Sequence, residues 1–61
     1  MSQLSEKELS GLQELLADED LLVKKFRMLA SHATDEQVKA ELERISARHQ
    51  NHLNQLYSKL S

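Results

Sequence analysis

Two histidines, His49 and His52, stand three residues apart in the segment ARHQNHL, where an amphipathic helix is expected to carry leucine or isoleucine. Residues i and i+3 of a helix lie about 5–6 Å apart at Cβ on one face, so two imidazoles at this spacing can converge on one ion. Earlier in the chain, Glu19 interrupts an otherwise apolar series between Leu16 and Val23. Two imidazoles and a carboxylate form a ligand set that zinc, iron or manganese accepts.

The residues before the histidines predict a first helix over about residues 6–31. Apolar side chains recur there every three or four residues, as in a helix with one buried face. Ser5 followed by Glu8 fits a capping box, which marks the start of this helix. His32 is expected at its C-terminal end, where an imidazole suits the helix dipole.

A second helix is predicted over about residues 35–60. Thr34 is the expected N-cap, with Gln37 completing a second capping box. The buried line of this helix is expected to be Val38, Leu42, Ile45, His49, His52, Leu56 and Leu60.

The turn between the two helices is only about three residues long, so the helices must lie antiparallel. The chain, residues 1–61, is therefore predicted to be a single all-α domain, an antiparallel helical hairpin. The register that this turn imposes places Glu19 opposite His49 and Phe26 opposite Leu42. It also places His52 opposite Leu16, one helical turn away from Glu19. The three polar residues of the predicted core are therefore expected to lie close together, at one level of the hairpin.

A chain of 61 residues without cysteine cannot rely on disulfides, and its own core is marginal. Leu15, Leu22 and Leu29 recur every seven residues and widen the apolar stripe beyond what one partner helix covers. We therefore expect a homodimer, in which two hairpins close a four-helix bundle. The two copies would bring two glutamates and four histidines together, enough ligands for two metal ions.

Several function classes find no support in the sequence. The formal net charge is -2, and no cluster of excess lysine and arginine points to nucleic acid as a partner. No apolar run approaches the roughly 18 residues that span a bilayer, and no signal peptide is visible, so we expect a soluble cytoplasmic protein. No catalytic residues are predicted, because no Ser–His–Asp set or Gly-rich phosphate loop is present.

The Glu19–His49–His52 set resembles half of the ligand pattern of ferritin-like di-metal bundles, in which a glutamate on one helix meets a Glu-x-x-His pair on the next. The chain from LLADEDLLVKKF to RHQNHLNQL also resembles the ferritin-like modules of coat-F-type spore coat proteins. Glu19 matches the glutamate of the first helix, and His52 matches the histidine of the pair. His49 departs from the pattern, because it stands where a bridging glutamate is expected, which argues against oxygen activation at a di-iron centre.

The resemblance implies a structural or scaffolding role, a location in the spore coat besides the cytoplasm, and other coat proteins as partners. A ferritin-like metal-binding redox or metal-storage protein is the alternative function. A third interpretation is a metal-free interaction module whose helical faces dock another protein. Without a metal, the polar layer would serve register or oligomer specificity. The residues alone leave these interpretations open.

Overall fold

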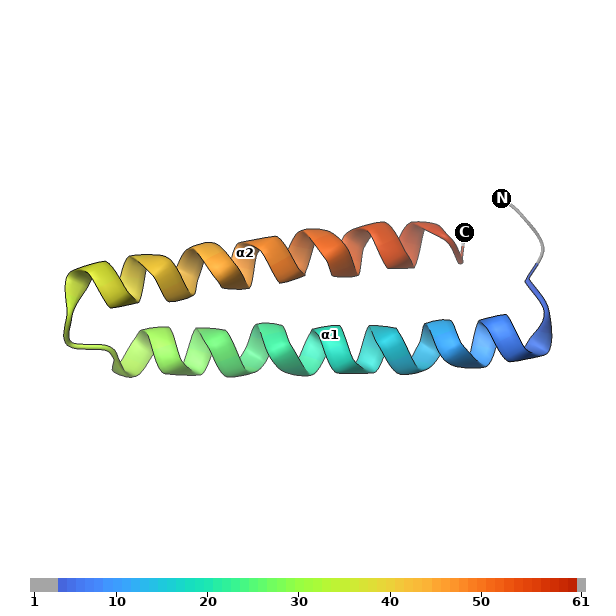
Figure 1. Ribbon diagram of the computed structural model, residues 1–61, viewed down its shortest axis with the longest axis horizontal. Coiled ribbons are helices and arrows are strands. Elements are labelled where there is room, and N and C mark those ends of the chain that lie inside the picture. Colours follow the sequence, from blue (N-terminus) through green and yellow to red (C-terminus); the bar gives the residue numbers. More distant parts are fainter. Residues whose placement is uncertain (1–3, 61) are drawn as a thin grey trace.

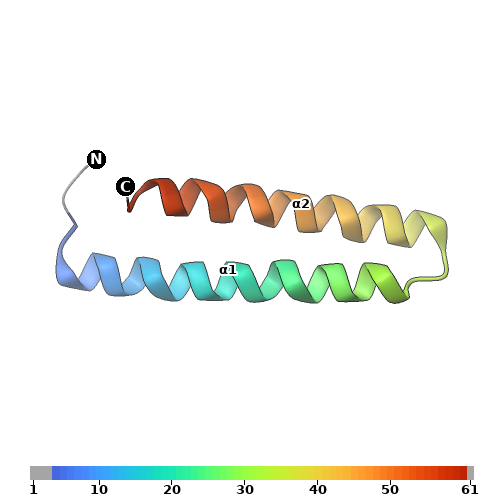
Figure 2. The same ribbon diagram turned by 180° about the vertical axis from the view of Figure 1, so that it is seen from behind.

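The protein is an antiparallel hairpin of two long helices, which confirms the predicted all-α class. The computed structural model describes residues 4–60, in which α1 (Glu6–His32) and α2 (Glu36–Ser58) pack along each other (Figure 1). The view from behind shows the same pairing from end to end of α2 (Figure 2). The described residues contain no strand, so α1–α2 packing makes up the whole fold.

Both ends of α1 are stabilised as the sequence predicts. The backbone N–H of Glu8 donates to the Ser5 hydroxyl oxygen at 3.1 Å, and the Glu8 carboxylate accepts from the Ser5 N–H at 3.0 Å. These two bonds form the expected capping box. At the other end, Nδ1 of His32 lies 3.0 Å from the Met28 carbonyl oxygen. This histidine therefore contacts a backbone carbonyl group in the last turn of α1.

The start of α2 differs from the prediction by one residue. Asp35, and not Thr34, is the N-cap, and its Oδ1 accepts a hydrogen bond from the Val38 N–H at 2.9 Å. Aspartate is a stronger N-cap than threonine, since its carboxylate also suits the positive end of the helix dipole. With the cap at Asp35, Gln37 no longer occupies the position that a capping box requires, and that part of the prediction is wrong.

The most buried positions on α2 lie one residue later than predicted, whereas Leu42, His49 and Leu56 of the predicted line stay partly buried. α1 buries Leu16, Val23 and Ala30, which belong to its apolar series and are spaced seven residues apart. On α2 the buried residues are Ser46 and Leu53. Their small and large side chains fill the seam, whereas three residues of the predicted line are exposed: Val38, His52 and Leu60.

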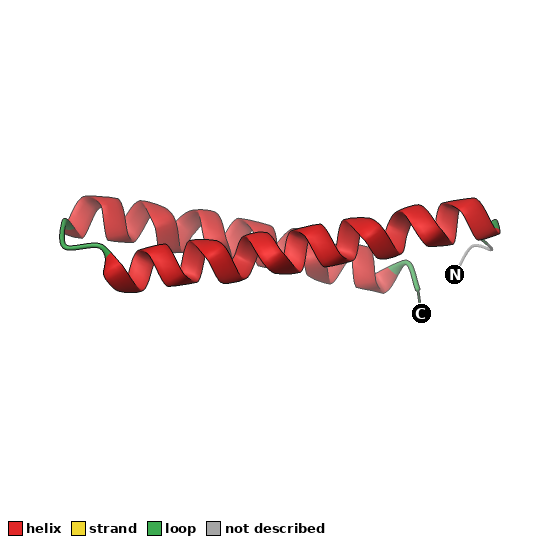
Figure 3. Ribbon diagram, turned by 90° about the horizontal axis from the view of Figure 1, so that it is seen from below, coloured by secondary structure: helices red, strands yellow, loops and turns green. Residues whose placement is uncertain are grey.

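Two helices can each hide only one stripe, and much apolar surface therefore stays in contact with solvent. The helices cross at a shallow angle (Figure 3) and form a slab of 45 × 16 × 11 Å between extreme Cα atoms. Among residues 4–60, nine large hydrophobic residues are exposed: Leu9, Leu15, Leu21, Leu22, Met28, Leu29, Val38, Tyr57 and Leu60. Neither helix in the described part of the chain is long and apolar enough to span a membrane.

Candidate metal site

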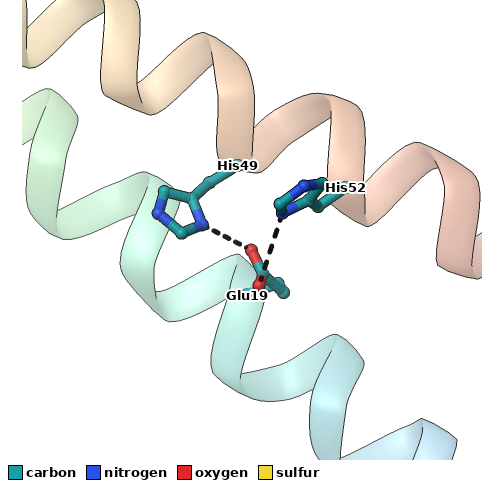
Figure 4. Close-up of side chains that lie close together, drawn as sticks. All are labelled: Glu19, His49 and His52. Atoms are coloured by element: carbon teal, nitrogen blue, oxygen red, sulfur yellow. Dashed lines mark hydrogen bonds and ion pairs between the residues drawn. The ribbon is translucent and has the colours of Figure 1, made fainter.

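The cluster begins with Glu19 and His49, which meet across the seam near the middle of the hairpin (Figure 4). Nδ1 of His49 lies 2.7 Å from Oε2 of Glu19, a hydrogen-bonding distance. Both side chains are largely enclosed, with exposed fractions of 23% for His49 and 19% for Glu19. The sequence prediction that α1 and α2 place these two residues opposite each other is confirmed.

His52 completes the cluster from the edge of the seam. Its Nδ1 lies 4.0 Å from Oε1 of Glu19, and its side chain is 53% exposed. Its ring stands edge-on to that of His49, with centroids 5.9 Å apart. The expectation that His52 is a core residue is wrong, because Leu53 takes the buried position and the preceding residue is turned about 100° away from it.

Phe26 is a neighbour of the site that the predicted register missed. That register placed Phe26 opposite Leu42, but its ring stacks on the His49 imidazole, with centroids 5.6 Å apart and planes 12° from parallel. The stacked ring restricts the plane of the imidazole, whose Nδ1 faces Glu19. The contact between Phe26 and His49 could have been predicted from spacing, because Phe26 follows Glu19 by two helical turns and therefore lies on the same side of α1.

The spacing of the three residues suits a metal ion. One ligand atom from each of Glu19, His49 and His52 can be chosen so that all lie within 4.8 Å of one another. Ligands about 2.0–2.1 Å from a tetrahedral zinc ion are separated by roughly 3.3 Å. Small side-chain adjustments would bring the three ligand atoms to the distances that a zinc ion requires, and a fourth coordination position would then stay open.

Metal ligation through Nδ1 of His49 would compete with the contact between this atom and Glu19. In the tautomer that carries its hydrogen on Nδ1, His49 donates to Oε2 of Glu19 across this 2.7 Å contact. Ligation through Nδ1 needs its lone pair, so the proton must move to Nε2 or to solvent. Protons and metal ions consequently compete for the same pair of atoms.

The rest of the described chain offers no equivalent cluster. Within residues 4–60, this is the one group of three histidine, aspartate or glutamate side chains with ligand atoms close enough to share an ion. The third histidine, His32, lies at the far end of α1 and contacts a backbone carbonyl. The sequence thus identified all three members of the cluster, although it misplaced one of them relative to the core.

Comparison with known proteins adds no family assignment. No protein-family model, curated protein sequence or solved structure matches the chain. The fold and the site define the protein as a two-helix hairpin that carries a carboxylate and two imidazoles at mid-length.

Proposed function

We propose that this protein is a small structural or scaffolding protein, similar in role to coat-F-type spore coat proteins. Two copies form a four-helix bundle, and a transition-metal ion bound by Glu19, His49 and His52 stabilises it. The observation that carries the proposal is the convergence of three ligand atoms within 4.8 Å, drawn from both helices. An ion held there ties α1 to α2 in a chain that has no disulfide.

The second imidazole supports metal binding over a metal-free polar layer. A Glu19–His49 hydrogen bond alone would satisfy both groups and would be enough to specify register. His52 adds an imidazole whose Nδ1 lies 4.0 Å from the other oxygen of the same carboxylate. A ligand set of two nitrogens and one oxygen is accepted by zinc, iron and manganese, and its imidazoles favour zinc or iron.

A metal-binding redox or storage role is the second candidate. The open coordination position and the 53% exposure of His52 favour it, because a substrate or a further ion could reach the site. Each chain, however, supplies Glu19 as its one carboxylate in the cluster. Bridged di-iron chemistry uses more carboxylates than this, so the structural role is preferred. Oxidation of added ferrous iron, faster with the protein than without it, would favour the redox alternative.

Metal analysis combined with thermal melts tests the proposal. Protein purified without a histidine tag should contain a stoichiometric transition metal, or take up zinc when it is added. At about pH 7.5, zinc should raise the melting temperature relative to chelator, because a ligand bound only to the folded state stabilises that state. At about pH 5.5, below the ordinary pKa of histidine, most of this effect should disappear, because protons displace the metal.

The double variant His49→Ala with His52→Ala is the matched control. It should melt at the same temperature with zinc and with chelator at both pH values. Equal melting temperatures of the wild-type protein with zinc and with chelator at the higher pH would contradict the metal proposal. The cluster would then be the polar layer of a metal-free bundle.

A further inference from the structure

One broad face of the hairpin is apolar along both helices. Leu15, Leu22 and Leu29 of α1 each directly precede a buried residue of the seam. On α2, the residues that directly precede the inward-facing positions are Val38, Ile45 and His52. We call these six residues the apolar face. Its five aliphatic members are exposed, apart from Ile45, which is half-buried.

The antiparallel arrangement puts these two rows on the same side of the hairpin. Two antiparallel helices are related by an approximate two-fold axis perpendicular to their common plane, so equivalent positions share a face. The opposite face confirms this geometry, because Arg27 of α1 and Gln50 of α2 occupy equivalent positions there and their side chains are hydrogen-bonded at 3.4 Å. That opposite face also carries Asp20 and Glu43, so charged and amide groups keep it suited to water.

A second copy of the chain is the occupant that fits the apolar face. The plane of the hairpin measures 45 × 16 Å, so one face offers on the order of 700 Å², close to the ~800 Å² that each partner buries in a stable interface. Five of the six side chains are aliphatic, and on each helix they repeat every seven residues, which is the pattern of one helix pair packing on another. A two-fold axis lets the face pack on its own copy, and the polar face then remains in solvent.

The candidate metal site lies at the edge of this same face. His52 belongs both to the apolar face and to the cluster, and it is the most exposed of the three ligands. A chain that covers the apolar face therefore removes water from His52 and restricts its side chain. It also brings its own Glu19–His49–His52 cluster to the neighbouring surface, where it can supply a group for the open coordination position.

We propose that docking of a second copy on the apolar face completes the metal site, so that dimer formation and metal binding are coupled. This inference rests on the proposed metal-binding function and adds the face and the partner on which the site depends. Coupling is reciprocal: if the dimer binds zinc more tightly than the monomer does, zinc strengthens the dimer correspondingly. Leu29 is the best residue to test, because it lies on the face but outside the cluster.

The experiment compares Leu29→Glu with Met28→Glu in the full chain. The two side chains are matched in exposure, at 51% and 55%, but Met28 points away from α2 and off the apolar face. Sedimentation equilibrium measures the dimer constant with zinc and with chelator, and titration calorimetry measures zinc affinity. Helix content by circular dichroism checks that each variant is folded.

We expect zinc to tighten the wild-type and Met28→Glu dimers alike. Leu29→Glu should be monomeric at micromolar concentration and bind zinc at least about tenfold more weakly, within the range typical of coupled sites. A Leu29→Glu dimer as strong as the wild type would overturn the assigned face. A Leu29→Glu monomer with wild-type zinc affinity would overturn the coupling and leave the metal function standing. Absence of zinc binding by the wild type would instead overturn the metal function, and the coupling with it.

Discussion

At the scale of single residues, Glu19 has two possible partners and one hydrogen bond. The carboxylate is 19% exposed and hydrogen-bonded to His49, while His52 stands 4.0 Å away. A carboxylate in a partly apolar seam loses part of its hydration, and the hydrogen bond offsets that loss. A carboxylate at position 19 is therefore expected to have a role, either as a ligand of a metal ion or as a group that fixes how the helices pair.

Replacing Glu19 by leucine separates these two uses. In chelator, we expect Glu19→Leu to melt at or above the wild-type temperature, because an apolar side chain in this layer removes the desolvation penalty of the carboxylate. In zinc, the wild type should gain stability and the variant should not, since it lacks one ligand. Thermal melts by circular dichroism in both buffers measure the difference.

Glu19→Gln is the matched control, because it keeps the size of the side chain and can still hydrogen-bond to His49. It should lose most of the zinc response without the gain expected of leucine. If chelator does not change the melting temperature of the wild type and Glu19→Leu melts higher, the polar layer specifies how the helices pair and does not bind a metal.

At the scale of secondary-structure elements, the first turn of α1 depends on the Ser5–Glu8 capping box. The pKa of the Glu8 carboxylate lies below its ordinary value of 4.5. The larger cause is the hydrogen bond from the Ser5 backbone N–H, and the smaller cause is the interaction with the Ser5 side chain. A carboxylate whose pKa is lower in the folded state adds stability above its unfolded pKa. That stability is lost as the pH falls through the lowered folded pKa.

The variant Glu8→Gln tests this contribution, because glutamine can still complete a capping box but carries no charge. At pH 7 the variant should melt slightly below the wild type. The gap should close as the pH falls below about 4.5, the ordinary pKa, where the glutamate takes up its proton. A gap of constant size across that range, measured by parallel melts in chelator, would show that the charge of Glu8 is not responsible.

At the scale of the whole molecule, the hairpin has little interior of its own. In the described chain, four hydrophobic residues and one serine are buried: Leu16, Val23, Ala30, Leu53 and Ser46. A chain this short hides a smaller part of its surface than larger domains do. If a second copy covers the apolar face, as we propose, the stability of the hairpin should depend on it.

We expect the melting temperature to rise with protein concentration, because association stabilises the folded state by mass action. Sedimentation equilibrium at micromolar concentration should give twice the chain mass of 7.0 kDa. A folded species of 7.0 kDa whose melting temperature does not change on tenfold dilution would contradict the dimer.

The sequence by itself was enough to predict the two helices, their antiparallel packing and the meeting of Glu19 with His49. These features follow from short-range physics: the period of apolar residues, the capping box at Ser5 and a turn too short for any other arrangement. His49 belongs to the seam whether α2 is rotated slightly one way or the other. Its place opposite Glu19 could therefore be predicted without knowing that rotation.

Only the tertiary structure decided how α2 is rotated about its own axis. The line through Val38 and Ile45 is the more apolar one in the sequence. The neighbouring line through Leu53 has Ser46 and Lys39 at the preceding seven-residue positions, so periodicity alone favours the line that the structure leaves more exposed. Packing against α1 buries Leu53 with the small Ser46 and turns His52 to the edge of the seam. The burial of a residue on α2 depends on which α1 side chains fill the space opposite it, and that is a property of the packed pair.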